Sequence, residues 1–170
     1  MRVLAIDPGN RESGWVVLDG ATHRPLEFGK TPNTQLLTDL HRGDVQFDAA
    51  VVEMVASYGM PVGAEVFETC VWIGRFVEAI AAVGVTAGLV KRQPVKLHHC
   101  HSPRANDANV RQALVDRFAY GERNFGKGTK ASPGWFFGFG ADVWQAYALG
   151  VYAADCMASG GAGEVAAGLR

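Results

Sequence analysis

The sequence predicts one α/β domain with a mixed five-stranded sheet and helices on both faces. Short apolar runs have the length and composition of buried strands. Longer segments with apolar residues three and four positions apart predict helices between those strands. A chain of 170 residues, 48% hydrophobic and 19% charged, can bury the core of a single domain.

The N-terminal residues predict an antiparallel meander of three strands. Val3–Ile6 is an unbroken apolar run that leads Asp7 directly into a Pro-Gly turn. A second apolar strand at 14–20 follows a short polar turn, and 25–30 can pair as the third strand. Asp7 is therefore expected at the end of a buried strand, where the sheet opens to solvent.

A helix and another acid-terminated strand follow the meander. Asn33 or Thr34 can cap a helix that runs to about Arg42 with leucines on one face. The apolar strand 49–54 then carries Glu53 near its end. Two acids at the ends of two separate apolar strands suggest a shared site.

The next elements are a long helix at 64–82 and a strand at 86–90. The order β-β-β-α-β-α-β-α, completed by a later helix, is the one that an RNase H-like fold requires. The expected apolar stripe of the long helix comprises Val66, Phe67, Val71, Phe76 and Ile80.

The segment 95–101 holds the cluster His98–His101, whose side chains include good zinc ligands. Adjacent residues of an extended segment point alternately and cannot all converge on one ion, so we expect these histidines to flank DNA instead.

An amphipathic helix at 104–118 comes next, with Asn106 or Asp107 as its cap. The following loop, 120–140, contains six glycines, three cations and the aromatic residues Trp135, Phe136, Phe137 and Phe139. Such a mixture suits a flexible loop that meets a nucleic-acid backbone and exposed bases, although some rings can fold back onto the core.

The last predicted helix spans 141–155 and has Asp142 in its first turn. We expect the domain to cover 1–157 and 158–170 to be a flexible tail.

The charge is unevenly distributed although the net charge is only −1. Residues 91–130 carry nine Lys/Arg against three Asp/Glu, whereas 1–90 carry six against eleven. An acidic body with a basic strip is typical of a nuclease, in which carboxylates hold metal and cations meet phosphates. The alternative is a solvated basic face without a partner.

The three cysteines are scattered and form no Cys-x-x-Cys pair, which indicates a reducing, cytoplasmic environment. The chain starts directly with a strand, so no signal peptide is expected. The longest apolar run, 79–90, is too short to cross a bilayer.

Asp7, Glu53 and Asp142 are the candidate metal ligands. Carboxylates from separate elements can gather around one or two Mg²⁺ ions, because Mg²⁺ prefers oxygen ligands and keeps some of its waters. Such ions activate water and stabilise the leaving oxygen in phosphodiester hydrolysis. Asp7 can instead serve only the turn after it, and Asp107 is expected to cap its helix rather than add a fourth acid.

These residues resemble the RuvC-type Holliday junction resolvases. The similarity runs from about residue 2 to residue 155, and its middle section is closest to the short RuvC-like nucleases of bacteriophages. The matching parts are Ile6–Gly9, Val52–Glu53, Val95–Leu97, Arg104–Phe118, and Asp142 with Ala146, Ala148 and Leu149.

The resemblance implies a homodimer that nicks four-way DNA junctions symmetrically with Mg²⁺ or Mn²⁺. It implies that Asp7 bridges two ions while Glu53 and Asp142 each complete one side. The bacterial resolvases usually carry a further acid three residues after the position of Asp142. This chain has Gln145 there, which can still offer a carbonyl oxygen.

Several residues are candidates for contact with DNA or with a second protomer. Tyr58 or Met60, just beyond Glu53, can wedge into the junction centre or simply pack in its loop. Trp72 and Phe76 can form a dimer interface or belong to the protomer core. Arg111 can contact phosphate or form a surface ion pair. The full set of candidate phosphate contacts is Lys96, Arg104, Arg111, Lys127 and Lys130.

Other function classes remain open. Another RNase H-like nuclease acting on branched DNA or RNA would use the same acids. A sugar-kinase-like ATPase also begins with an Asp-x-Gly strand, but its further phosphate loops are not found in the sequence. A non-catalytic junction-binding relative is the non-enzyme alternative, against which the intact acids argue.

Overall fold

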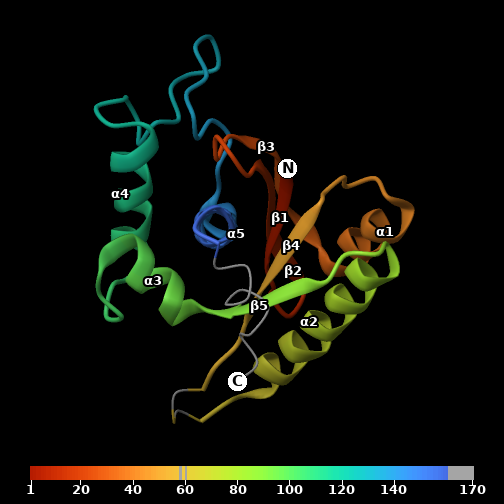
Figure 1. Cartoon of the computed structure of the whole chain (residues 1–170). Coiled ribbons are helices and arrows are strands. Elements are labelled where there is room, and N and C mark those ends of the chain that lie inside the picture. Colours follow the sequence, from red (N-terminus) through yellow and green to blue (C-terminus); the bar gives the residue numbers. More distant parts are fainter. Residues whose placement is uncertain (58, 60, 161–170) are drawn as a thin grey trace.

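Five strands form one mixed sheet in the computed structural model, which describes residues 1–57, 59 and 61–160 (Figure 1). Their order across the sheet is β3-β2-β1-β4-β5. The first three strands are antiparallel neighbours, while β4 pairs in parallel with β1 and β5 pairs in parallel with β4. The predicted mixed sheet is confirmed. The strands are β1 (Arg2–Asp7), β2 (Glu12–Asp19), β3 (Pro25–Pro32), β4 (Ala49–Met54) and β5 (Ala87–Lys91).

Helices cover both faces of the sheet, as predicted (Figure 1). Two of them, α1 and α2, contact each other on one face. On the other face α5 lies directly on the central strands, and α3 and α4 pack outside it. The helices are α1 (Asn33–Arg42), α2 (Ala64–Ala82), α3 (Arg92–Cys100), α4 (Asp107–Phe118) and α5 (Ala141–Ala158).

Strand β1 contributes to two hydrophobic cores at once. Val3 and Ala5 face the α5 side, whereas Leu4 and Ile6 face α1 and α2, and all four are fully buried. Because successive side chains of a strand point to opposite faces, an unbroken apolar run is what a strand covered on both sides needs. Burying these four side chains on both faces makes β1 a rigid support for Asp7 at its end.

Helix α3 differs from the extended segment that the sequence predicts. Arg92–Cys100 is helical, with Pro94 in its first turn, where the missing N–H costs no helical hydrogen bond. The helical period turns His98 and His99 toward α5. The prediction that they flank DNA is therefore wrong.

The buried face of α2 also differs from the prediction. Phe67 and Val71 were expected in the apolar stripe, but they are 61% and 62% exposed. Glu68, Arg75 and Glu78 are exposed on the same side of the helix as Phe67 and Val71, and this charged side faces away from the sheet. The residues that are buried are Thr69, Ile73, Phe76, Ala79 and Ile80.

The two rings proposed for a dimer interface lie in or against the protomer core. Phe76 is fully buried, and Trp72 packs beside it with ring centroids 5.9 Å apart. The guanidinium of Arg75 lies 4.3 Å from the centroid of the Trp72 ring. Phe76 therefore belongs to the protomer core and not to an interface, whereas for the half-buried Trp72 the interface stays a prediction.

The segment between α4 and α5 is folded back on the protein. Phe136 and Phe139 are buried and pack against Trp144 and Tyr147 of α5. Gly126 has φ +73° and lies so close to Ala119 that an added Cβ would be 2.4 Å from the Cβ of that residue. The expectation of a flexible loop with exposed rings is wrong for the two buried phenylalanines.

Element boundaries otherwise differ by a few residues. Helix α4 starts at Asp107 rather than at 104, because Asn106 and Asn109 form a reciprocal capping box. Helix α5 continues to Ala158, beyond the predicted end. The predicted tail from 161 onward lies outside the described residues. No helix in the described ranges is both long and apolar enough to span a membrane.

Candidate active site

Asp7 stands at the end of β1, and the backbone of the turn that follows it is hydrogen-bonded by other side chains. The Gly9 amide donates to Ser13 Oγ at 3.4 Å, and Asn33 Nδ2 donates to the Gly9 carbonyl at 2.8 Å. Ser13 Oγ in turn donates to Asn33 Oδ1 at 2.6 Å, and both residues are buried. This network fixes the turn and leaves the Asp7 carboxylate available for other partners.

Glu53 lies beside Asp7 because of the parallel register. Ile6 pairs with Val52, so the next residue of each strand, Asp7 and Glu53, reaches the same edge of the sheet. The Glu53 side chain is only 15% exposed. Arg92, the first residue of α3, places its guanidinium nitrogen Nη1 3.1 Å from Glu53 Oε1.

Asp142 reaches the same edge from the first turn of α5. Asp7 pairs with Gly14 of β2. A Cβ on Gly14 would lie 2.4 Å from the Asp142 carbonyl oxygen, so only glycine lets the start of α5 approach so closely. The Asp142 carboxylate lies 2.8 Å from Lys30 Nζ of β3, which is also 3.4 Å from Glu12.

The acids influence one another strongly. Burial, followed by the negative charge of Glu53, raises the pKa of Asp7 to about 8. Asp142 and Asp107 raise this pKa further, whereas the Arg92 guanidinium opposes the shift. Burial also raises the pKa of Glu53. Negative charge therefore exceeds positive charge where the strands end, which favours a cation there.

Asp107 is not the cap of α4, contrary to expectation, because Asn106 accepts from the Asn109 amide. Its carboxylate instead accepts a hydrogen bond from Arg92 Nη2 at 2.7 Å. Gln145, three residues after Asp142, lines a hollow of about 210 Å³ together with Asp107 and Arg111.

The donor atoms suit a hard divalent cation, but they are not gathered around one point. Within residues 1–57, 59 and 61–160, no three His, Cys, Asp or Glu side chains are placed to hold one ion. Glu53 faces Arg92, and Asp142 faces Lys30. By chemistry the carboxylates fit Mg²⁺. Ligation would require Glu53 and Asp142 to turn from these cations toward Asp7.

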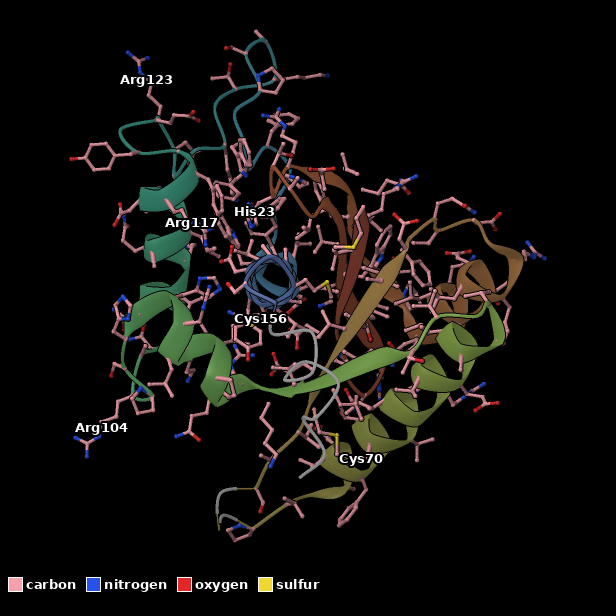
Figure 2. All side chains as sticks on the ribbon, viewed as in Figure 1. His23, Cys70, Arg104, Arg117, Arg123 and Cys156 are labelled. Carbon is pink, nitrogen blue, oxygen red and sulfur yellow. The ribbon has the colours of Figure 1, made fainter. Side chains whose placement is uncertain are left out.

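The predicted phosphate contacts occupy different surroundings. Burial raises the pKa of Glu53, and Lys96 lies close enough to this carboxyl to oppose that rise. Arg111 lies over the Phe125 ring, 4.8 Å from its centroid. Arg104 projects outward from the protein (Figure 2). Lys127 is half-buried and Lys130 exposed, both before α5. Tyr58 and Met60 lie outside the described residues.

Sequence reasoning missed the two cations that face the acids, Arg92 and Lys30. Arg92 directly follows β5, the strand next to the one that carries Glu53. A cation at the end of a neighbouring parallel strand was a signal that could have been used. Lys30 carried no comparable signal, because its approach to Asp142 depends on how α5 docks on β3.

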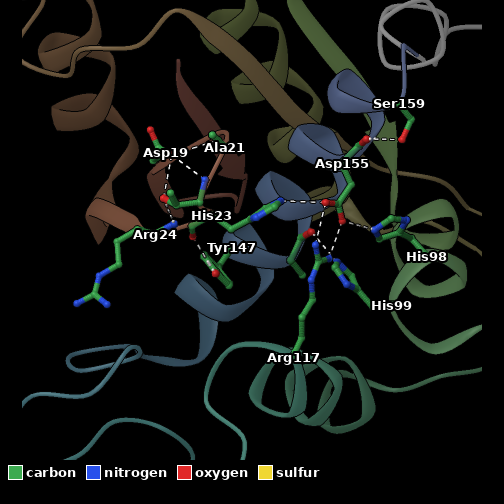
Figure 3. A network of polar contacts seen from close by, with 12 residues as sticks. Asp19, Ala21, His23, Arg24, His98, His99, Arg117, Tyr147, Asp155 and Ser159 are labelled. Carbon is green, nitrogen blue, oxygen red and sulfur yellow. Dashed lines mark hydrogen bonds and ion pairs between the residues drawn. The ribbon is translucent and has the colours of Figure 1, made fainter.

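A second polar cluster surrounds Asp155 near the other end of α5 (Figure 3). Its carboxylate accepts two hydrogen bonds from Arg117, at 2.6 and 2.9 Å. His23 Nε2 and His98 Nε2 lie 2.9 and 2.7 Å from its two oxygens. Here one arginine and two histidines surround a single acid.

The arrangement of strands and helices matches solved structures of RuvC. A structure of Thermus thermophilus RuvC matches with a TM-score of 0.67 and 19% identity, over 94% of this chain and 97% of that chain. The chain has the RNase H-like fold of RuvC. A structure titled as T. thermophilus RuvC in complex with Holliday junction substrate matches with a TM-score of 0.66 and 19% identity, over 95% and 97%. No protein-family model and no curated protein matches the sequence.

Proposed function

We propose that the protein is a metal-dependent endonuclease that resolves four-way DNA junctions by paired symmetric nicks. The observation that carries this proposal is the meeting of Asp7, Glu53 and Asp142 at one edge of an RNase H-like sheet. Their proximity, together with burial, raises the pKa of Asp7 to about 8. The likeness to a structure of RuvC bound to a Holliday junction supports the choice of substrate.

In this proposal Asp7, Glu53 and Asp142 hold Mg²⁺ or Mn²⁺, and Gln145 is only a candidate for a further, dispensable oxygen donor. The bound ions supply an activated water and neutralise charge on the leaving oxygen. Asp7 is the central ligand because β1 lies between the strands that bring Gly14 and Glu53 beside it. Ser13 and Asn33 hold the turn that follows, so the carboxylate stays aligned during turnover.

The substrate is tested by incubating the purified chain with Mg²⁺ and labelled four-way junction, Y-form, duplex and RNA–DNA hybrid. The proposal expects two nicks at symmetric positions in the junction and little cutting of duplex. Preferential cutting of the hybrid or of Y-form DNA would assign the site to another RNase H-like nuclease. Junction binding without any cutting would assign a non-catalytic role.

The metal is tested on the same junction. Ca²⁺ accepts hard oxygen ligands in looser geometry, so it should support binding but not hydrolysis. The expected result is a gel shift in Ca²⁺ and cleavage only after Mg²⁺ or Mn²⁺ is added. Full cleavage in excess chelator would overturn the metal mechanism.

Phosphate contacts are proposed along the basic strip, by Lys96, Arg104, Arg111, Lys127 and Lys130, with Tyr58 as a further DNA contact. Neutralised phosphates release counterions, so affinity should fall steeply with salt. Replacing Lys127 and Lys130 by Gln should reduce the slope of log K against log salt by about 2. An unchanged slope would place both lysines in solvent.

Paired nicks require two active sites related by a two-fold axis, so we propose a homodimer. The outer face of α2 supports this, because Phe67 and Val71 are large, apolar and exposed there. Phe67→Glu should convert the dimer to a monomer in light scattering. Leu26→Glu, at a comparably exposed position on β3, should not. A wild-type monomer near 18.2 kDa at micromolar concentration would contradict the dimer.

Within the resolvases, we propose a relation to the short phage enzymes. The residues that support it are Val95–Leu97 and Arg104–Phe118, which include the start of α4 and its capping residue.

A further inference from the structure

Arg92 is the cation most closely engaged with the acids at the end of the sheet. Nη1 lies 3.1 and 3.4 Å from the two oxygens of Glu53, and Nη2 lies 2.7 Å from Asp107 Oδ1. The Arg92 side chain is 29% exposed, so it is neither sealed in the core nor free in solvent. It also opposes the rise in the pKa of Asp7, which places its charge near that carboxylate too.

Arg92 links the linings of two hollows at the surface. One hollow, of about 280 Å³, is lined by Arg92, Glu53 and apolar residues such as Met54 and Val62. The other is lined by Asp107 and Asp142. The hydrogen bond from Arg92 to Asp107 therefore joins the two hollows beside the acids.

The chemistry of Arg92 suits a phosphodiester. A guanidinium has five N–H groups in a planar fork, more than two carboxylates require, and the fork matches two oxygens of one phosphate. A phosphate brought among Asp7, Glu53 and Asp142 meets carboxylates that repel it. An adjacent cation that is always protonated reduces that repulsion.

We propose that Arg92 is a catalytic residue that contacts the scissile phosphodiester, and that Asp107 is the positioning residue that holds its guanidinium in place. The inference rests on the proposed nuclease function, since it names a contact to the strand that is cut. Asp107 is then neither helix cap nor metal ligand. Its carboxylate, 61% exposed, holds the guanidinium from the solvent side, so Arg92 keeps this partner when Glu53 turns toward Asp7 to bind metal.

The test combines a protein change with a substrate change. The linkage cut by the wild-type enzyme is mapped first. A junction is then made with one neutral methylphosphonate at that linkage, and the affinities of both junctions are measured in Ca²⁺ by fluorescence anisotropy. Loss of a charged hydrogen bond costs about 1.5–3 kcal/mol, so the neutral linkage should weaken wild-type binding about 10- to 150-fold.

In Arg92→Gln the contact is already gone, so the neutral linkage should weaken binding less. The ratio of the affinities for the two junctions should be at least about fivefold smaller than in wild type. Arg42→Gln is the matched control, since Arg42 is an exposed arginine at the end of α1, away from the acids. Arg42→Gln should lose as much affinity on introduction of the methylphosphonate as wild type does. Asp107→Asn should lose less affinity than wild type but more than Arg92→Gln, with an unchanged melting temperature.

If the methylphosphonate weakens the binding of Arg92→Gln as much as that of wild type, the proposal is overturned. If that variant does not fold, Arg92→Lys keeps the charge but loses the fork. It should bind the junction normally yet cleave about tenfold more slowly in single turnover. A wild-type rate in Arg92→Lys would equally overturn the bidentate contact. If the wild-type enzyme cuts no junction, the proposed function itself is refuted. If it cuts the junction but the effects of Arg92→Gln and of the methylphosphonate are independent, only the role of Arg92 is refuted.

Discussion

The two ends of α5 hold aspartates in opposite electrostatic surroundings. At its start, Asp142 joins Asp7, Glu53 and Asp107, and these acids outnumber the cations Arg92 and Lys30 that face them. Near its end, Asp155 is a single acid that Arg117, His23 and His98 all contact (Figure 3). The cluster at the start of α5 therefore has an excess of negative charge, whereas both oxygens of Asp155 near its end have hydrogen-bonding partners.

The pKa shifts of the two clusters have opposite signs. Burial and neighbouring acids raise the pKa of Asp7 to about 8. Burial alone would also raise the pKa of Asp155, but hydrogen bonds from Arg117 and His98 hold it well below its usual range. An acid that resists ionisation costs stability at neutral pH, whereas one that is held ionised contributes it. The difference indicates that the first cluster serves binding and the second holds elements together.

The largest expected effect is on cleavage. Asp142→Asn should lower the single-turnover cleavage rate about 1,000-fold, since loss of a metal ligand forfeits several kcal/mol of charge stabilisation. Junction binding in Ca²⁺ should be retained or tighter, because one charge that repels phosphate is gone. Gln145→Ala should keep most activity, and Asp116→Asn on the outer face of α4 serves as the charge control. The reverse ranking of Asp142 and Gln145 would make Gln145 the ligand.

The next effect is on stability and concerns the other end of α5. Asp155→Asn leaves Arg117 without its carboxylate, and breaking such a pair should cost about 2–4 kcal/mol in the free energy of unfolding. Urea unfolding at pH 7 measures the loss, and Asp116→Asn should change stability by less than about 0.5 kcal/mol. The folded fraction should retain its cleavage rate. Loss of activity without loss of stability would place Asp155 in the active site.

The third effect is a pH dependence at Asp7. Its pKa is about 8 when folded, above its ordinary value of 3.8, so the folded state binds this proton more tightly than the unfolded state. Ionisation of Asp7 therefore costs stability increasingly as pH rises from about 4 to about 8. In chelator, Asp7→Asn should be more stable than wild type by about 1–3 kcal/mol at pH 8 and equal to it at pH 4. A difference that does not change with pH would contradict the shifted pKa.

The smallest effect has the opposite pH sign and lies near Asp155. Burial lowers the pKa of His99 to about 4, although its hydrogen bond to the Ala148 carbonyl opposes the shift. Between about pH 6.5 and 4 the unfolded state binds this proton more readily, so wild-type stability falls as pH falls through that window. His99→Gln should reduce that decline by about 1–2 kcal/mol. An equal decline in both proteins would show that another group causes it.

The strand and helix boundaries show where sequence patterns are informative. Buried strands such as 49–54 and the long helix at 64–82 were predicted with their observed bounds, because length and apolar spacing are local properties. Helix α3 was missed, since Pro94 and a cluster of histidines have no apolar period. The exposure of Phe67 was missed although the sequence holds a signal for it, because Glu68, Arg75 and Glu78 lie on the same side of the helix.

For the site, the sequence by itself determined which acids end buried strands and which begins α5. An apolar run that delivers a single carboxylate to a turn identifies Asp7 and Glu53 without knowledge of the fold. Parallel pairing then necessarily brings the two acids to one edge. These conclusions need only local patterns and the chain order.

Only the tertiary structure decided which cation meets which acid. Lys30 faces Asp142 because Gly14 lets α5 settle against β2, and Arg92 links Glu53 to Asp107 because α4 packs beside α3. Long charged side chains bridge elements that are distant in sequence, so their partners depend on docking rather than on periodicity.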